Sequence, residues 1–239
     1  MSTQETELQK IRIWDAPVRV FHWLLVFSFA GAYLTAESEY WRLVHVTLGY
    51  TLGGLLAFRL VWGVVGTRYA RFSSFVRGPG AVLRYLKSLR SGQPEHHLGH
   101  NPAGAVAIVL LMLMGFGIVA TGYATYNDLG PDWLGEVHDL LANGMLLVIA
   151  GHLFGVVSAS LQHKENLVRA MVTGYKAGAA DQGIRRTWAT VAVALVIAVL
   201  GFWWLQWQSA PKPDAGTAQT SQAVQTAQAA QSGQNKVSN

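Results

Sequence analysis

Two histidines, His138 and His152, lie 14 residues apart in GEVHDLLANGMLLVIAGHLFGVV, a segment apolar enough to cross a membrane. In an α-helix this spacing gives a rotation of about 1400°, within roughly 40° of whole turns, and a rise of about 21 Å. The two imidazoles would therefore share one helix face at two depths. Because ionisable side chains are costly in a membrane and usually face the interior of a helix bundle, both are candidates for a functional site.

Two further histidines fall at matching depths in other apolar segments. His22 opens the first such segment, and His45 opens the second, which runs in the opposite direction. Pairing by depth gives His22 with His152 and His45 with His138. A lone histidine near a helix end is more often an interfacial residue than a ligand, but two cross-helix pairs at two depths are hard to explain by packing. We therefore predict that all four histidines are metal ligands.

The number of ligands in each pair indicates which group they bind. A zinc site needs about four N, S or O ligands, and each pair supplies only two imidazoles. Two trans imidazoles on facing helices suit a haem, whose other iron ligands belong to the porphyrin. The chain has no cysteine, which excludes disulfides, thiolate iron–sulfur clusters and haem attached through a C-x-x-C-H sequence. We predict two haem b groups, one at each depth.

Other residues of the same segments could support these groups. Arg59 lies 14 residues after His45 and hence at the depth of the His22 and His152 pair. It would either bind a haem propionate or extend to the lipid headgroups. Glycines on the second and fourth segments would let a flat macrocycle approach or would mediate ordinary helix contacts. They are Gly49, Gly53, Gly54, Gly144, Gly151 and Gly155.

Two carboxylates flank one of the histidines. Glu136 and Asp139 lie close to His138 in the sequence. They could accept a hydrogen bond that orients its ring, or they could be surface charges.

Transmembrane helices are the elements that would carry these residues. Of the 239 residues, 51% are hydrophobic and only 13% are charged, which is typical of an integral membrane protein. Roughly 20 apolar residues are needed to cross about 30 Å of hydrocarbon. Five windows qualify, over residues 20–35, 43–65, 103–123, 133–161 and 188–205. We expect an all-α integral membrane fold, with a four-helix haem-binding bundle and a fifth, C-terminal transmembrane helix.

The distribution of basic residues predicts the orientation in the membrane. Lysines and arginines concentrate in the N-terminal segment and in the long connections after the second and fourth windows, whereas the two opposite connections contain only Arg42. By the positive-inside rule, the N-terminus and both long connections are cytoplasmic, and the C-terminus lies outside. Within the first long connection, AVLRYLKSLR (residues 81–90) resembles a short amphipathic helix, either on the membrane surface or in solution.

Several segments together resemble the bacterial cytochrome b561 family, including the b-type cytochrome subunit of membrane nickel–iron hydrogenases. They are IRIWDAPVRVFHW, HVTLGY, FRLVWGVVGTRYARFSSFVRGP, LGHNPAGA and EVHDLLANGMLLVIAGHLFGVVSASLQHKENLVRAMVTGYK, and they span about residues 11 to 176. The resemblance implies a four-helix di-haem protein with ligands on the first, second and fourth helices. The residues that match this pattern are His22, His45, His138 and His152.

The resemblance also implies a location and a path for electrons. The protein would lie in the bacterial cytoplasmic (inner) membrane as a multi-pass protein with a periplasmic C-terminus. The outer haem, held by His45 and His138, would take electrons from a periplasmic partner, and the inner haem, held by His22 and His152, would pass them to quinone near the cytoplasmic face. The fifth helix and the Gln/Ala-rich tail extend beyond the family pattern.

These expectations divide the chain into five parts. They are a cytoplasmic N-terminal segment (1–19), a four-helix di-haem membrane domain (20–161), a cytoplasmic loop (162–187), the fifth transmembrane helix (188–207) and a periplasmic tail (208–239). The tail is of low complexity and has no aromatic residue after Trp207. Such a sequence cannot bury enough apolar surface to fold, so we predict that it is disordered.

His100, in LGHNP before the third helix, is a further candidate. It could hydrogen-bond a haem propionate or help a quinone to take up a proton, since an imidazole ordinarily titrates near pH 6.5. His96 and His97 precede it, so a polar surface cluster is the alternative. His163 lies beyond the fourth helix and is expected to be solvated.

These features predict electron transfer across the membrane. An iron with two histidine ligands has no open position for oxygen or substrate, which favours electron relay. We find no nucleotide-binding motif, so we expect the donor and acceptor to be a quinone and either a periplasmic cytochrome or a catalytic redox subunit. A homodimer is possible, no nucleic-acid partner is expected, and whether the chain is part of an enzyme stays open. The alternatives are a metal-ion transporter that uses the histidines and a membrane anchor without redox function.

Overall fold

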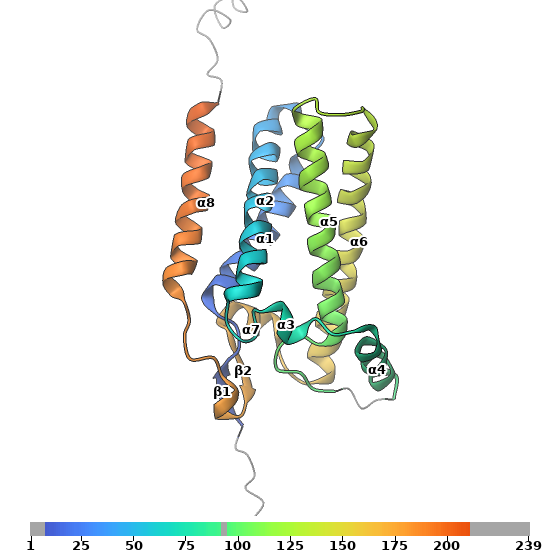
Figure 1. The fold of residues 1–239 in the computed structure, drawn as a ribbon, viewed down its shortest axis with the longest axis vertical. Helices are drawn as coiled ribbons and strands as arrows, with labels where there is room; N and C mark the ends of the chain where they lie inside the picture. The colour runs from blue at the N-terminus through green and yellow to red at the C-terminus, as the bar shows by residue number, and fades with distance from the viewer. Residues whose placement is uncertain (1–7, 92–94, 211–239) are drawn as a thin grey trace, which may run out of the picture. The chain divides into compact units, whose positions relative to one another are not determined.

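The computed structural model describes residues 8–91 and 95–210 (Figure 1). The chain divides into two compact units, residues 1–201 and 202–239. Of the second unit, the described part is the end of the last helix and Ala210. All packing described below lies within the first unit. The part of the predicted disordered tail from residue 211 onward lies outside the described residues.

In the part of the chain that the structure describes, five helices are long and apolar enough to cross a membrane. They are α1 (Ala16–Thr35), α2 (Arg42–Val65), α5 (Pro102–Tyr126), α6 (Trp133–Gln162) and α8 (Ala189–Ser209). The five predicted spans and the all-α membrane fold are therefore confirmed. The first helix begins four residues earlier than predicted because Asp15 caps it and Pro17 occupies its first turn, both of which favour a helix start.

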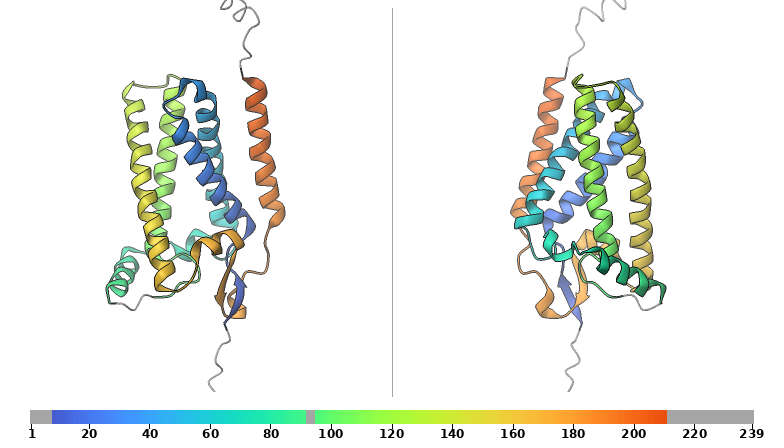
Figure 2. Two further views of the ribbon diagram at one scale, coloured as in Figure 1. Left: turned by 180° about the vertical axis from the view of Figure 1, so that it is seen from behind. Right: turned by 45° about the vertical axis from the view of Figure 1, so that its right-hand side comes forward.

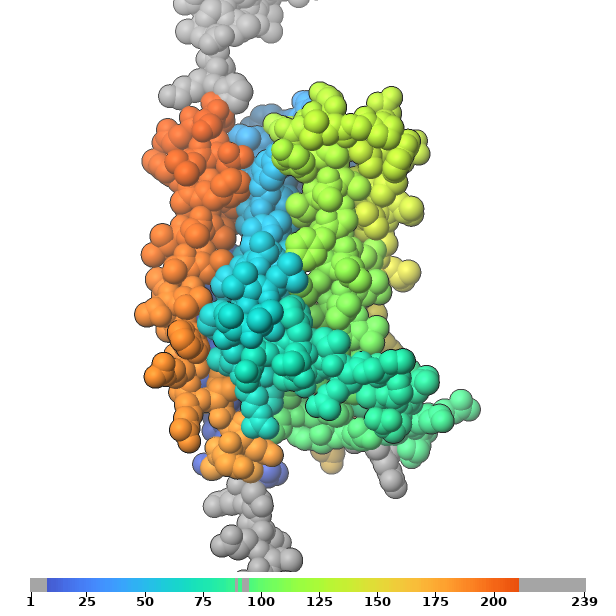
Figure 3. All heavy atoms as spheres, viewed as in Figure 1, coloured from blue at the N-terminus to red at the C-terminus, as the bar shows by residue number. Residues whose placement is uncertain are grey.

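Four of these helices form the bundle seen in Figure 2. α1 packs against α2, α5 packs against α6, and α2 also contacts α5. Large apolar side chains such as Leu113 of α5 and Leu147 of α6 are exposed on the bundle surface. Figure 3 shows the upper half of α5 with no other segment over it. Such faces suit contact with lipid, where the backbone polar groups must be satisfied within each helix.

Short elements gather at one end of the bundle, which we call the sheet end (Figures 1 and 2). They are β1 (Gln9–Arg12), β2 (Tyr175–Gly178), α3 (Phe72–Phe75), α4 (Pro79–Arg90), α7 (Leu167–Thr173) and the short 3-10 helix η2 (Ala180–Gln182). We call the opposite end the loop end; it carries η1 (Glu39–Trp41) and the connection between α5 and α6. The helix expected over residues 81–90 is present as α4.

The β-sheet at the sheet end was not predicted. β1 and β2 pair antiparallel, with Ile11 opposite Lys176 and Arg12 opposite Tyr175. The turn before β2 uses Gly174, whose φ is +88°, a conformation that glycine adopts without a steric cost. A Cβ there would lie 2.8 Å from Trp14 O. The pairing joins the N-terminal segment to the chain that follows α6.

Asp15 connects the start of α1 to the end of α2 at the sheet end. Its carboxylate is fully buried and accepts hydrogen bonds from Val18 N (2.8 Å), Trp62 Nε1 (3.1 Å) and Thr67 Oγ1 (2.6 Å). A buried core surrounds it, formed by Ile11, Ile13, Trp14, Val18, Trp62, Ala70 and Ala170. These hydrogen bonds fix the position of α1 along the bundle relative to α2. They therefore also fix the relative heights of His22 on α1 and His45 on α2.

Candidate functional site

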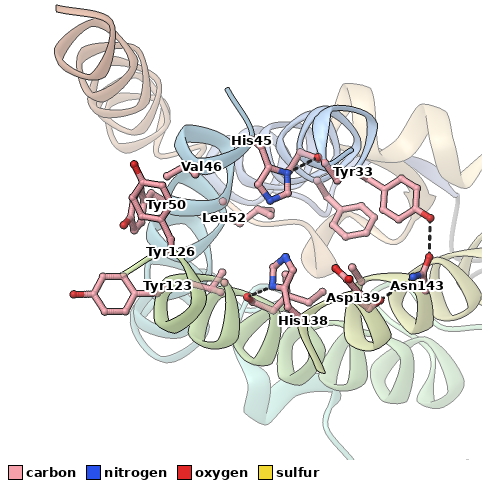
Figure 4. A pocket seen from close by; sticks show the side chains of 18 of the residues that line it. Tyr33, His45, Val46, Tyr50, Leu52, Tyr123, Tyr126, His138, Asp139 and Asn143 are labelled. Carbon is pink, nitrogen blue, oxygen red and sulfur yellow. Dashed lines mark hydrogen bonds between the residues drawn. The ribbon is translucent and has the colours of Figure 1, made fainter. Parts of the chain in front are cut away.

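His45 of α2 and His138 of α6 face one another near the loop end (Figure 4). Their ring centres are 6.1 Å apart, and the rings are inclined by 72°. A metal held by two imidazoles lies about 2 Å from each nitrogen. Because each nitrogen is roughly 1 Å from its ring centre, such a metal needs ring centres about 6 Å apart, as observed for this pair.

Hydrogen bonds that both rings donate to the neighbouring helices fix their orientation. His45 Nδ1 lies 2.8 Å from Ala32 O of α1, and His138 Nδ1 lies 3.0 Å from Ile118 O of α5. A carbonyl oxygen only accepts, so Nδ1 carries the hydrogen in each ring and the lone pair on Nε2 is free to bind a metal. His138 Nδ1 has a second neighbour, Thr121 Oγ1, at 3.3 Å.

The groups that orient His138 are therefore Ile118 O and Thr121 Oγ1. The two candidates from the sequence, Glu136 and Asp139, make no described hydrogen bond to its ring, although Asp139 lines the same cavity as His138. The observed partners belong to α5. No sequence signal marked them, because they depend on which helix packs against α6.

A cavity of about 470 Å³ surrounds the pair and is lined by all four bundle helices. Gly49 lines it, and a Cβ at this position would meet nothing within 4 Å. A Cβ at Gly122 would lie 2.8 Å from His138 Cε1, so only glycine leaves room for the ring there. Tyr33 of α1 donates a hydrogen bond to Asn143 Oδ1 of α6 across the cavity wall (2.8 Å). The space suits a large planar ligand between the imidazoles.

The predicted glycines fall into two groups. Gly53 and Gly144 pack closely, since a Cβ there would lie 3.0 Å from Val119 and Met114 respectively. The others face space that no described atom occupies within 4 Å, namely Gly49, Gly54, Gly151 and Gly155. Helix contact therefore accounts for two of the positions and leaves the remainder open.

The second pair of histidines lies toward the sheet end. His22 of α1 and His152 of α6 are close enough to interact electrostatically. Arg59 of α2 is only 4% exposed, and its guanidinium lies 4.7 Å from the ring centre of Phe72. It therefore does not extend to the lipid headgroups.

His100 belongs to this second group rather than to a surface cluster. Its ring centre lies 4.6 Å from those of both Trp14 and Phe75. Burial lowers the pKa of His100 to about 3, with further contributions from Arg59, His152 and His22. The ring is therefore neutral at physiological pH, and it can donate or accept a hydrogen bond without carrying charge.

Three polar atoms of this group are buried without a hydrogen-bond partner among the described residues. They are His22 Nδ1, Arg59 Nη1 and His100 Nδ1. Leaving such a group unpaired costs about 1–3 kcal/mol, and more when it is charged. A ligand with carboxylates beside a metal would pair them, so these residues fit a haem with its propionates. In the described ranges no three His, Asp or Glu side chains gather as ligands of a bare metal ion.

Comparison with known proteins identifies the family. The family described as prokaryotic cytochrome b561 matches residues 13–174. The chain is 25% identical to the probable Ni/Fe-hydrogenase 1 B-type cytochrome subunit of Escherichia coli (strain K12), covering 69% of this chain and 89% of the relative. It is 24% identical to the probable Ni/Fe-hydrogenase B-type cytochrome subunit of Rhizobium leguminosarum bv. viciae, covering 70% and 89% respectively. No solved structure matches the chain.

The bundle of apolar helices with inward-facing histidines defines an integral membrane cytochrome of b type. The chain belongs to the prokaryotic cytochrome b561 family. It is a multi-pass membrane protein that transfers electrons, and haem b is its cofactor. The family resemblance expected from the sequence motifs is thus confirmed.

Proposed function

We propose that this chain is a di-haem cytochrome that carries electrons across the bacterial inner membrane, between a redox protein on the periplasmic side and the quinone pool. His45 and His138 would hold one haem near the loop end, and His22 and His152 would hold the other near the sheet end. Haem supplies one-electron exchange between ferric and ferrous iron. With two histidines bound to each iron, neither haem would have an open position for oxygen or substrate.

The geometry of the loop-end pair is the observation that carries this proposal. His45 and His138 face one another with ring centres 6.1 Å apart, and each Nδ1 is bonded to a carbonyl of a neighbouring helix. Both rings are therefore held with Nε2 directed to the shared space. Histidines that only packed against each other would not require both Nε2 atoms to be free.

Buried polar groups support the sheet-end assignment. Arg59 would form a charge-assisted hydrogen bond with a haem propionate through Nη1, which has no described partner. His100 would hydrogen-bond a propionate or a quinone through Nδ1, which is likewise unpaired. Trp14 and Phe75 both pack against the His100 ring and restrict its position.

The distribution of charge supports the orientation. Among the described residues, the sheet end carries most of the basic side chains, including Arg68, Arg77, Arg84 and Arg169, whereas the loop end has only Arg42. We therefore assign the sheet end to the cytoplasm, with the N-terminal segment and the long connections, and the loop end to the periplasm. Electrons would enter or leave through quinone at the cytoplasmic end.

The names of the relatives support a particular partner. The E. coli and R. leguminosarum proteins are named as B-type cytochrome subunits of Ni/Fe hydrogenases. By analogy, a catalytic redox subunit on the periplasmic side is the partner we propose, with a periplasmic cytochrome in the same role as the alternative. The loop end presents the haem held by His45 and His138 to either partner.

A haem count with reduced-minus-oxidised spectra tests the assignment. We expect two non-covalent haems per chain, and fewer in a correctly assembled protein would refute the di-haem proposal. His138→Ala should remove mainly the loop-end haem and His22→Ala mainly the sheet-end haem. His97→Ala, outside both pairs, should retain two. A metal-ion transporter would instead show metal-dependent flux without a chromophore, and a simple anchor would keep its colour when the four histidines are replaced.

A further inference from the structure

A cluster of ionisable side chains lies at the sheet end, outside both histidine pairs. Glu165 is at its centre, and we call Glu165, Lys176, His96 and His163 the Glu165 cluster. Its members come from three separate segments: the connection before α5, the connection between α6 and α7, and β2. Neither the haem ligands nor the propionate contacts account for this arrangement.

Direct contacts link the members of the Glu165 cluster. Glu165 Oε1 lies 3.1 Å from His96 Nε2, and Glu165 Oε2 lies 2.8 Å from Lys176 Nζ. The ring centres of His96 and His163 are 5.2 Å apart. Lys176 also donates a hydrogen bond to His97 O (3.1 Å). One carboxylate thus joins an imidazole pair on one side to an ammonium group on the other.

Burial increases along this series of contacts. The side-chain exposure is 46% for His96, 19% for Glu165 and 5% for Lys176. The imidazole end is therefore open to water, and the ammonium end lies in the interior. Lys176 Nζ binds the carbonyl oxygen of His97, three residues before His100, and its charge also acts on His100. The cluster therefore lies beside the segment that carries His100 of the sheet-end group.

The protonation of the cluster can respond to charge at that site. Burial acts to raise the pKa of Glu165, but the hydrogen bonds and charges of Lys176 and His96 outweigh it and lower the pKa. Glu165 is therefore ionised at neutral pH and pairs with Lys176. Burial, assisted by His96, lowers the pKa of His163. An added negative charge nearby favours the protonated form of an imidazole, and in a low-dielectric interior its effect extends further than in water.

We propose that the Glu165 cluster is a proton-exchange site, where the imidazoles of His96 and His163 take up a proton from water when the sheet-end haem is reduced. The inference rests on the proposed function, because it requires a haem held by His22 and His152. On reduction, a ring nitrogen of the pair would take up a proton from water, and the proton would return to water on reoxidation. Glu165 stabilises the protonated ring through its contact with His96.

Other charged and titratable groups lie close to the Glu165 cluster. Burial lowers the pKa of His97, which Glu95 partly opposes, and the His97 ring lies 5.6 Å from that of Tyr85. A cavity beside Glu165 and Lys176 is also lined by three such groups, Lys10, Arg169 and Tyr175. Arg77 acts on His97. Because the side chain of His97 lies outside the contacts of Glu165, it provides a matched control.

Redox titrations of the purified holoprotein between about pH 5.5 and 8.5, where an imidazole changes charge, test the proposal. We expect the midpoint potential of the sheet-end haem to fall as the pH rises. In the double variant His96→Asn/His163→Asn, the slope of midpoint potential against pH should decrease by at least half. Each single variant should show an intermediate slope. His97→Asn should keep most of the native slope. The loop-end haem should be unaffected in all variants.

Proton uptake provides a second measurement that does not depend on activity. Reduction in a weakly buffered solution with a pH indicator should show protons taken up by the native protein, and fewer by the double variant. A native slope in the double variant, or an equal loss in His97→Asn, would overturn the proposal. Either result with two haems still bound would leave the di-haem function intact, whereas absence of haem would refute that function itself.

Discussion

The imidazoles of His45 and His138 are oriented by backbone atoms rather than by side chains. Their acceptors are Ala32 O and Ile118 O, which belong to the helices packed against α2 and α6. A backbone carbonyl cannot be removed by substitution, and its position follows the position of the helix. At the scale of single residues, the geometry of the pair thus depends on the space that the neighbouring helices leave for each ring.

A substitution at Gly122 tests whether the position of the His138 ring depends on the space that α5 leaves for it. Gly122→Ala would place a methyl group 2.8 Å from His138 Cε1, so the ring must move and the loop-end haem should be lost. We expect about half of the native haem content by pyridine haemochrome assay. Gly201→Ala is the control, since a Cβ there meets nothing within 4 Å. Full haem content in Gly122→Ala would mean that His138 does not need its observed position.

Arg59 tests the sheet-end site. A buried positive charge beside a haem favours the reduced iron, so Arg59→Gln should lower the midpoint potential of the sheet-end haem, whereas Arg59→Lys should stay closer to the native value. The exposed Arg68 at the same end serves as the control through Arg68→Gln. An equal shift in Arg59→Lys and Arg59→Gln, or a shift of the loop-end haem, would argue against a propionate contact.

At the scale of the elements, buried contacts at the sheet end hold the helices in register. Asp15 caps α1 and also accepts hydrogen bonds from Trp62 and Thr67, at the end of α2 and just beyond it. Asn166 caps α7 through the bond that Arg169 N donates to its side chain (2.7 Å), and no hydrogen bond from its side chain to another helix is described. Comparing the two residues therefore distinguishes the effect of a helix cap from that of hydrogen bonds between helices.

Asp15→Ala should destabilise the protein more than Asn166→Ala. Loss of a cap costs about 1 kcal/mol, and leaving buried donors unpaired adds about 1–3 kcal/mol. Thermal unfolding in detergent, followed by haem absorbance, should show a larger decrease of Tm for Asp15→Ala. The sheet-end haem should be released first. Similar Tm values for both variants would mean that the bonds of Asp15 to Trp62 and Thr67 contribute little.

Hydropathy was sufficient to predict the five spans, because each depends only on a local run of apolar residues. The β-sheet was not predictable in the same way. Its strands have four residues each, and pairing Ile11 with Lys176 depends on how α6 and α7 return the chain to its N-terminal segment. Periodicity within a segment carries no information about such a contact.

The same distinction between local sequence patterns and contacts between distant segments applies to the candidate site. The spacing of His138 and His152 placed them on one helix face, and the direction of the second span placed His45 at one level with His138, where the structure brings these two rings together. The roles of Ile118, Thr121 and Gly122 were not foreseen, since they require knowledge that α5 packs against α6. Asp15 was likewise missed, because its partners follow it by about fifty residues in the chain.

At the scale of the whole molecule, the two ends differ in charge, and the proposed direction of insertion depends on that difference. Because the chain has no cysteine, single cysteines can report which end faces the periplasm. Asp132→Cys at the loop end should react with a membrane-impermeant thiol reagent in intact spheroplasts, and Ser91→Cys at the sheet end should react only after lysis. Both positions are exposed. The opposite labelling pattern would invert the proposed orientation.

The position of α6 in the chain has a consequence for biosynthesis. α6 supplies one histidine to each pair and is the last of the four bundle helices to be synthesised. Because a chain emerges from its N-terminus, His22 and His45 enter the membrane before either has a partner. If the pairs hold haem as proposed, neither cofactor has both of its ligands until α6 is synthesised, and the insertion of this one helix completes both sites.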